Sequence, residues 1–303
     1  MITDRRQFVA ASAAGAVGVL GQQLSFAQAP ELFRSFHHKV GPIDWYCETQ
    51  GRGPTVVLIP SGEGDCGSFA KVAALLASRF QVLTFDMPGF SRSSDPPGFD
   101  RYTISQAAGE IAALTRSLEL GPATFYGRSS GGQIALRLAA EHPDLVRRAI
   151  VHEVAPSAER LRDGGPVAAS QPPSDPTPGP GGLTPSSSDE QIIAVCKGLF
   201  RNQMNENPQA WDALGADYHQ RLQRNYVTWV RRYFPIPDMR TPTPDELRRR
   251  PVTWTIGGLT RAAAFHWNVV AGHAAGIEVG LLMCMHFPQV SIPEALATHI
   301  ARA

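Results

Sequence analysis

Residues 127–132, with the sequence GRSSGG, constrain the fold more than any other feature of the chain. They follow a short apolar run, Ala123 to Tyr126, and precede a helical pattern, Gln133 to His142. The G-x-S-x-G spacing is typical of a sharp turn between a strand and a helix, because flanking glycines let the two elements approach closely. Such a turn strains its central serine and exposes the hydroxyl at the C-terminal edge of a sheet. The sequence therefore predicts a candidate nucleophile, Ser129, at this turn.

Strand and helix patterns alternate along most of the chain. Continuous apolar, β-branched runs such as Thr55 to Pro60 are typical of strands buried on both faces of a parallel sheet. The predicted strands cover residues 32–39, 43–48, 55–60, 81–86, 123–126, 148–152, 252–256 and 280–283. The predicted helices around them cover residues 69–78, 104–118, 131–142 and 292–303. This alternation predicts an α/β protein with a mostly parallel, doubly wound sheet.

The alternation stops after Ala155. Residues 164–188 are rich in Pro, Gly and Ser and have almost no apolar periodicity, which predicts a flexible surface loop. Helical patterns follow at residues 190–202, 208–214 and 218–233. We therefore expect a core domain formed by residues 30–155 and 251–303, with a helical cap, residues 156–250, inserted after the sixth strand.

The first 29 residues have the pattern of an export signal. Arg5 and Arg6 precede a weakly apolar run, Val9 to Leu20, and small-residue cleavage sites end at Ala27 and Ala29. This order predicts a twin-arginine signal peptide that is removed near residue 27. The protein would then be exported folded and act in the periplasm or outside the cell. The alternative is an uncleaved anchor helix, which we disfavour because the run is too short to span a bilayer.

The charge balance narrows the range of partners. The chain has 28 basic and 27 acidic residues, which argues against nucleic acid or an anionic membrane as the main partner. We expect a neutral small-molecule substrate and no stable membrane insertion after processing. No nucleotide-binding motif is present, and we expect no metal or organic cofactor. The sequence leaves open whether the protein is a monomer or a homodimer.

The cysteines form no close pair. Cys47, Cys66, Cys196 and Cys284 lack both disulfide-type and metal-type spacing. A protein that is exported folded acquires its structure in a reducing compartment. We therefore expect all four to be buried and unpaired.

A nucleophilic serine needs a histidine base and a carboxylate that orients the histidine. Of nine histidines, His286 is best placed, because it follows the last predicted strand and precedes the last helix. The seventh strand is followed by no Asp or Glu before Arg261, although the acid commonly lies there. Glu153 instead ends the sixth strand, beside the strand of Ser129, where a buried carboxylate would need a partner. We expect Ser129, His286 and Glu153 to act together; the alternatives are a loop-capping histidine and a salt-bridged or helix-capping glutamate.

An oxyanion hole needs two backbone N–H groups directed at the developing negative charge. Ser130, directly after the nucleophile, can supply one from the start of the helix. The second should come from the loop after the third strand. Gly62 is the preferred donor there, and Ser61 is its rival.

With these residues located, the chain resembles the zearalenone lactone hydrolases, which are α/β-hydrolases that open the ester ring of a resorcylic macrolide. The similar stretches lie between residues 42 and 300 and comprise residues 56–66, 84–89, 127–132, 152–153, 225–229, 280–282 and 285–288. The cap stretch, residues 225–229, is the most specific, because generic hydrolases share the core motifs but not this cap.

The resemblance implies that Ser129, Glu153 and His286 form the catalytic triad of an acyl-enzyme mechanism. It also places the family's substrate-stacking tryptophan on Trp229, which would otherwise be interpreted as a core aromatic. Further candidates for substrate binding are Tyr233, Phe287 and Ser61.

Two departures bear on the substrate. Ser61 stands where the family commonly has an aspartate, and the Pro/Gly/Ser stretch is longer than in the family. The alternatives are a hydrolase for another lactone, an aryl ester or a carbon–carbon bond, and a receptor that binds a small ligand without catalysis.

Overall fold

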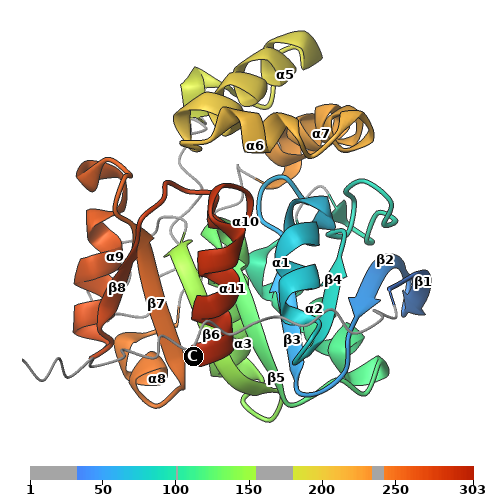
Figure 1. The fold of residues 1–303 in the computed structure, drawn as a ribbon. Helices are drawn as coiled ribbons and strands as arrows, with labels where there is room; N and C mark the ends of the chain where they lie inside the picture. Colours follow the sequence, from blue (N-terminus) through green and yellow to red (C-terminus); the bar gives the residue numbers. More distant parts are fainter. Residues whose placement is uncertain (1–32, 100–101, 155–179, 234–241) are drawn as a thin grey trace, which may run out of the picture.

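A sheet of eight strands organises the molecule (Figure 1). The structure is a computed structural model that describes residues 33–99, 102–154, 180–233 and 242–303. The strands are β1 (Arg34–Val40), β2 (Ile43–Gln50), β3 (Thr55–Ile59), β4 (Gln81–Phe85), β5 (Ala123–Arg128), β6 (Val146–Val154), β7 (Val252–Gly257) and β8 (Val279–Leu282). Their order is β1-β2-β4-β3-β5-β6-β7-β8, with β2 antiparallel to both its neighbours and the other pairs parallel. All eight predicted strands are present, which confirms the predicted α/β architecture.

Helices cover both faces of the sheet (Figure 1). One face packs on α1 (Ala70–Leu76) and α11 (Pro293–Arg302), and the other on α2 (Ile104–Ser117), α3 (Ser129–Glu141) and α9 (Ala262–Ala274). Strand β3 lies between these two cores, which explains why its residues from Val56 to Ile59 are all apolar. Val56 and Leu58 belong to the first of these cores and Val57 and Ile59 to the second.

Three predicted helices differ from the observed ones at their ends. The first begins as a 3-10 turn, η1 (Cys66–Phe69), before α1. The second, α3, begins at Ser129, two residues earlier than predicted. The last, predicted over residues 292–303, corresponds to α11. A short helix that was not predicted, α10 (Pro288–Ser291), precedes it and stays separate because Pro293 cannot donate the backbone hydrogen bond that would continue one helix. Helix α9 was not predicted, because its apolar residues follow no helical period.

The cap is inserted in the sequence between β6 and β7. It lies over the C-terminal edge of the sheet (Figure 1). It contains η3 (Pro180–Gly182), α5 (Asp189–Gly198), the π-helical segment η4 (Leu199–Gln203), α6 (Pro208–Asp212), α7 (Ala216–Thr228) and a second π-helical segment, η5 (Trp229–Tyr233). Helix α8 (Pro244–Arg248) leads back to β7. The cap has its own apolar core, which includes Ile192, Phe200, Trp211 and Tyr226.

Several sequence predictions lie wholly or partly outside the described residues. The predicted signal, residues 1–29, lies outside them, as does most of the predicted loop 164–188. The four cysteines are described, and they are buried and unpaired, as predicted. Within the described ranges, no helix combines the length and apolarity needed to cross a bilayer.

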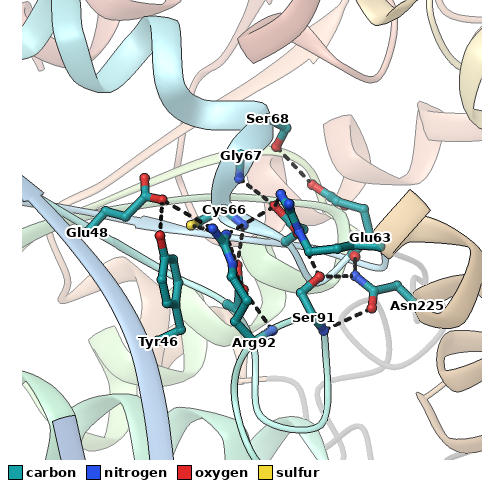
Figure 2. Close-up of polar contacts among 12 residues, drawn as sticks. Tyr46, Glu48, Glu63, Cys66, Gly67, Ser68, Ser91, Arg92 and Asn225 are labelled. Carbon is teal, nitrogen blue, oxygen red and sulfur yellow. Dashed lines mark hydrogen bonds and ion pairs between the residues drawn. The ribbon is translucent and has the colours of Figure 1, made fainter. Parts of the chain in front are cut away.

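A buried polar network joins the cap to the core (Figure 2). The Asn225 side chain on α7 donates to the Glu63 carbonyl oxygen and to the Ser91 hydroxyl, both at 2.7 Å. Its Oδ1 accepts from the Ser91 N–H at 3.0 Å. Arg221 Nε on the same helix donates to Asp65 Oδ2 at 2.6 Å. Helix α7 is therefore attached to the loop that follows β3.

The turn between β5 and α3 has the strained geometry that its sequence predicts. Ser129 has a φ of 51°, a left-handed conformation that costs a non-glycine residue about 1–3 kcal/mol. A Cβ atom on Gly127 would lie 2.2 Å from the carbonyl oxygen of Gly131. Only glycine at position 127 therefore lets the strand and the helix meet so closely.

We expect Gly127→Ala to lose about 3 kcal/mol or more of unfolding free energy, because the new methyl group meets backbone that cannot move aside. Gly132→Ala is the matched control. Its Cβ would meet Val154 Cγ2 at 3.1 Å and the Gly127 carbonyl oxygen at 3.3 Å, both much longer than the 2.2 Å contact at Gly127, and we expect a change within about 1 kcal/mol. Urea denaturation of both variants measures the difference. Equal stability would contradict this account of the turn.

Candidate active site

Ser129, the candidate nucleophile, lies half-buried at the turn between β5 and α3. Its backbone forms a parallel bridge with Val154, the last residue of β6. This bridge places the turn next to Glu153. The sequence prediction that both residues lie at the same edge of the sheet is therefore met by the backbone.

Glu153 and His286 form a buried hydrogen-bonded pair. His286 Nδ1 donates to Glu153 Oε2 at 2.7 Å, and both side chains are almost fully buried. The other carboxylate oxygen, Oε1, accepts from the Gly257 N–H at 2.8 Å. Glu153 has a φ of 40°, so the end of β6 is strained like the serine turn. With its Nδ1 proton directed to the carboxylate, a neutral His286 has a lone pair on Nε2 that can accept a proton.

The environment keeps the pair in the ionic state that base catalysis needs. Burial lowers the pKa of His286, and the positive charge of Arg128 adds to this, against the hydrogen bond and charge of Glu153. Burial would raise the pKa of Glu153, but the hydrogen bond from His286 and its partial charge hold it below the usual range. Near neutral pH the histidine is therefore uncharged and the carboxylate is ionised.

The predicted oxyanion residues lie together. The Gly64 N–H donates to the Ser61 carbonyl at 2.9 Å, which closes a turn with Gly62 and Glu63 at its centre. The hydroxyls of Ser61 and Ser130 are 3.2 Å apart, so this turn lies against the first turn of α3. The loop after β3 and the start of α3 thus meet next to Ser129, as an oxyanion hole requires.

Of the predicted substrate-binding aromatics, Trp229 lies next to the oxyanion loop. It is half-buried at the start of η5, and a Cβ on Gly62 would be 2.7 Å from its Nε1. Its ring packs edge-on against Phe200 with a centroid distance of 5.4 Å. Trp229 is therefore placed where the cap faces the candidate catalytic residues.

The other two aromatics lie in clusters. Tyr233 packs on Phe90 and Tyr102, with ring centroids 5.1 and 5.3 Å away. Phe287 is fully buried and packs on Trp211 of the cap at 5.0 Å. Both residues connect cap and core, and their contact with a substrate stays a prediction.

One group of potential metal ligands lies close together among the described residues. Donor atoms of Asp65, Cys66 and Asp86 are within 4.8 Å of one another. The guanidinium of Arg92 binds Asp86 through two hydrogen bonds of 2.6 and 2.9 Å. Burial raises the pKa of the Cys66 thiol, which disfavours the thiolate that a metal would need. The chemistry of this group is that of a salt bridge.

Two buried charges beside the site, Glu63 and Arg128, were not predicted from the sequence. Their side chains form an ion pair of 2.6 Å. The available signal was their position: each is a charged residue next to a glycine of a predicted catalytic loop.

Known proteins share the fold, and two of them share about a third of the aligned sequence. A family model for the alpha/beta hydrolase fold matches residues 54–172. Zearalenone hydrolase from Bionectria ochroleuca is 34% identical over 264 residues, which cover 85% of this chain and 92% of that protein. Zearalenone hydrolase from Cladophialophora bantiana is 35% identical over 281 residues, covering 90% and 97%. The enol-lactonase from Burkholderia xenovorans has the same fold, with a TM-score of 0.63 at 18% identity over 88% of this chain and 98% of that one.

The fold and these matches define an α/β-hydrolase, of the class that cleaves esters and lactones. Because two curated relatives exceed 30% identity over most of the chain, the protein belongs to the zearalenone hydrolase family. These matches confirm the resemblance that the sequence motifs indicated.

His152, beside Glu153, generates a prediction about stability. Its side chain is buried. Nδ1 lies 3.0 Å from Thr255 Oγ1, and Nε2 lies 3.3 Å from the Met285 carbonyl oxygen. Burial lowers its pKa from 6.5 to about 4. The unfolded chain therefore takes up a proton near pH 6.5, whereas the folded protein does so only near pH 4.

We expect unfolding free energy to be lost as pH falls through this window, by up to about 1.4 kcal/mol per pH unit from this group. His152→Gln should be less stable at pH 7 but should show a flatter decline towards pH 4. Urea denaturation across the pH range measures both slopes. Identical slopes would show that His152 is not the group responsible.

Proposed function

We propose that this protein hydrolyses the ester bond of a resorcylic macrolide lactone such as zearalenone, through an acyl-enzyme on Ser129. The observation that carries the proposal is the buried hydrogen bond between Glu153 and His286, next to the serine turn. The family membership supports the substrate class, because the two relatives named above are zearalenone hydrolases.

The reaction would proceed in two steps. In the first, His286 Nε2 takes the Ser129 proton while the serine oxygen attacks the lactone carbonyl. The N–H groups of Gly62 and Ser130 stabilise the tetrahedral oxyanion. When the ester C–O bond breaks, protonated His286 gives its proton to the departing oxygen, and the opened ring remains bound to Ser129 as an ester.

In the second step, water replaces the leaving group. Neutral His286 takes a proton from the water, whose oxygen attacks the acyl-enzyme carbonyl. Collapse of this intermediate breaks the bond to Ser129, and His286 returns the proton to the serine oxygen. Glu153 fixes the orientation of the His286 imidazole and stabilises the imidazolium that forms in both steps.

The cap contributes an apolar wall for such a substrate. Trp229 borders the oxyanion loop, so an aromatic ring bound beside the scissile ester could stack on its indole. Ser61, on the same loop, can donate or accept a hydrogen bond with a polar substituent near the carbonyl. A largely apolar pocket with a few polar groups is what a neutral macrolide needs.

Incubation of the mature protein with zearalenone, followed by chromatography, tests the proposal. We expect a ring-opened product, and loss of about 10⁴-fold or more in turnover for Ser129→Ala. Trp229→Ala should lose more activity on zearalenone than on the small ester p-nitrophenyl acetate, since only the macrolide reaches the cap wall.

The other outcomes identify the alternatives. Cleavage of p-nitrophenyl acetate without zearalenone turnover would assign the triad to another lactone, an aryl ester or a carbon–carbon bond. Tight binding of zearalenone with no cleavage of either compound would identify a non-catalytic receptor. An active Ser129→Ala variant would overturn the proposed nucleophile.

We also propose that the protein is exported by the twin-arginine route, on the basis of the sequence of residues 1–29. The full chain expressed in a bacterium should appear in the periplasmic fraction, shortened near residue 27. Arg5→Lys/Arg6→Lys should leave the precursor in the cytoplasm. Unchanged processing of that variant would contradict twin-arginine export.

A further inference from the structure

We propose that Glu63 and Arg128 are a positioning pair that holds the oxyanion loop, the serine turn and the histidine loop in one arrangement. The inference rests on the proposed function, because it assigns these residues a role in the same reaction. Neither residue needs to touch the substrate for this role.

The pair connects the first two loops directly. Arg128 Nη2 donates to Glu63 Oε2 at 2.6 Å, and the side chains are 2% and 0% exposed. Glu63 directly follows Gly62, the preferred oxyanion donor, and Arg128 directly precedes Ser129. A change in the distance between the two side chains would therefore change the distance between the oxyanion donor and the nucleophile.

The third loop is joined through an aromatic ring. The guanidinium carbon of Arg128 lies 3.7 Å from the centroid of the Phe287 ring, a close cation–π contact. Phe287 directly follows His286. Gly62, Ser129 and His286 therefore each have a chain neighbour in one stack of Glu63, Arg128 and Phe287.

The cap contacts this stack at Glu63. Asn225 Nδ2 on α7 donates to the backbone carbonyl of Glu63 at 2.7 Å (Figure 2). Ser68 Oγ lies 3.5 Å from Glu63 Oε1 (Figure 2). Glu63 is thus held at its backbone by the cap and at both carboxylate oxygens by the core.

Stability alone does not explain this arrangement. Removing two charges from water commonly costs as much as their attraction returns, so a buried ion pair is weak evidence for stabilisation. Arg128 Nε is buried and has no hydrogen-bond partner among the described residues, which adds to the cost. A buried pair that stability does not explain, placed between the three proposed catalytic loops, points to a role in positioning.

The pair also affects the charge around His286. Arg128 lowers the pKa of His286 and Glu63 raises it, so that the two charges oppose each other at the base. Among the described residues, other charged or titratable groups near the histidine loop include Glu153 and His152 on β6, Cys284 in the loop itself, and Glu206 of the cap, which accepts from the Met285 N–H. The acid limb of the pH profile of kcat/KM reports the protonation of His286. Removing one member of the pair should therefore shift this limb.

The test measures kcat, KM and the pH dependence of kcat/KM with p-nitrophenyl acetate, normalised to titrated active sites. Arg128→Met should lower kcat about 10- to 100-fold with little change in KM, because the catalytic groups move apart by a fraction of an ångström to an ångström. Its acid limb should move to higher pH, since Glu63 is left unopposed. Glu63→Gln should move the limb to lower pH. The double variant should return the limb towards the wild-type position without restoring kcat.

Arg137→Met is the matched control. Arg137 is also 2% exposed and also forms an ion pair, with Glu141 at 2.9 Å, but it lies near the other end of α3. Its loss should lower stability and leave the acid limb and the normalised kcat unchanged. Arg128→Lys, which keeps the charge, should keep the limb near the wild-type position and recover part of kcat, and it serves as the test if Arg128→Met does not fold.

Two results would overturn the inference: normalised kcat and acid limb unchanged in both single variants, or limb shifts of the same sign. The readout separates this failure from failure of the proposed function. A wild-type protein that cleaves p-nitrophenyl acetate but not zearalenone leaves the positioning role fully testable. A wild-type protein that cleaves neither compound overturns the proposed function, and the positioning role with it.

Discussion

The hydrogen bond between Glu153 and His286 is the interaction on which the rest of the site depends. It joins the end of β6 to the loop after β8 across the end of β7. A Cβ on Gly257, the last residue of β7, would lie 2.7 Å from Glu153 Oε1, and its N–H binds that oxygen. The carboxylate from β6 therefore fills the space after β7 where hydrolases of this fold commonly place their acid. A Cβ on Gly257 would also lie 2.5 Å from the Cys284 carbonyl oxygen, so only glycine fits at the end of β7. The position of the Glu153 carboxylate agrees with the lack of an Asp or Glu between Gly257 and Arg261.

The cap and the catalytic loops stabilise one another. The His286 N–H donates to the Met204 carbonyl at 3.0 Å, and the Asn225 side chain binds the Glu63 carbonyl. Trp229 closes over Gly62 from the same cap. The loops that carry His286 and Gly62 are thus held by the cap, which also carries Trp229, the proposed substrate wall. We therefore expect substitutions in the cap to affect both substrate selection and catalytic geometry.

Local patterns predicted most of the fold and the main site residues. Buried parallel strands are continuous apolar runs, and the serine turn has a sterically required glycine spacing, so both are visible in short windows. Glu153 was found because a carboxylate among apolar residues demands a partner. Helix α9 was missed because it has no amphipathic period. The pairing of Glu63 with Arg128 was missed because their 65-residue separation is closed only by the sheet. The burial of Phe287 likewise depends on where the cap packs.

The most direct test of the account is the turnover of Glu153→Gln on p-nitrophenyl acetate, which does not depend on the identity of the natural substrate. Glutamine keeps the size of the side chain but removes the charge that orients and stabilises His286. We predict a loss of about 10³-fold or more in kcat, with the fold retained. Turnover close to that of the wild-type protein would show that Glu153 is not the acid of this hydrolase.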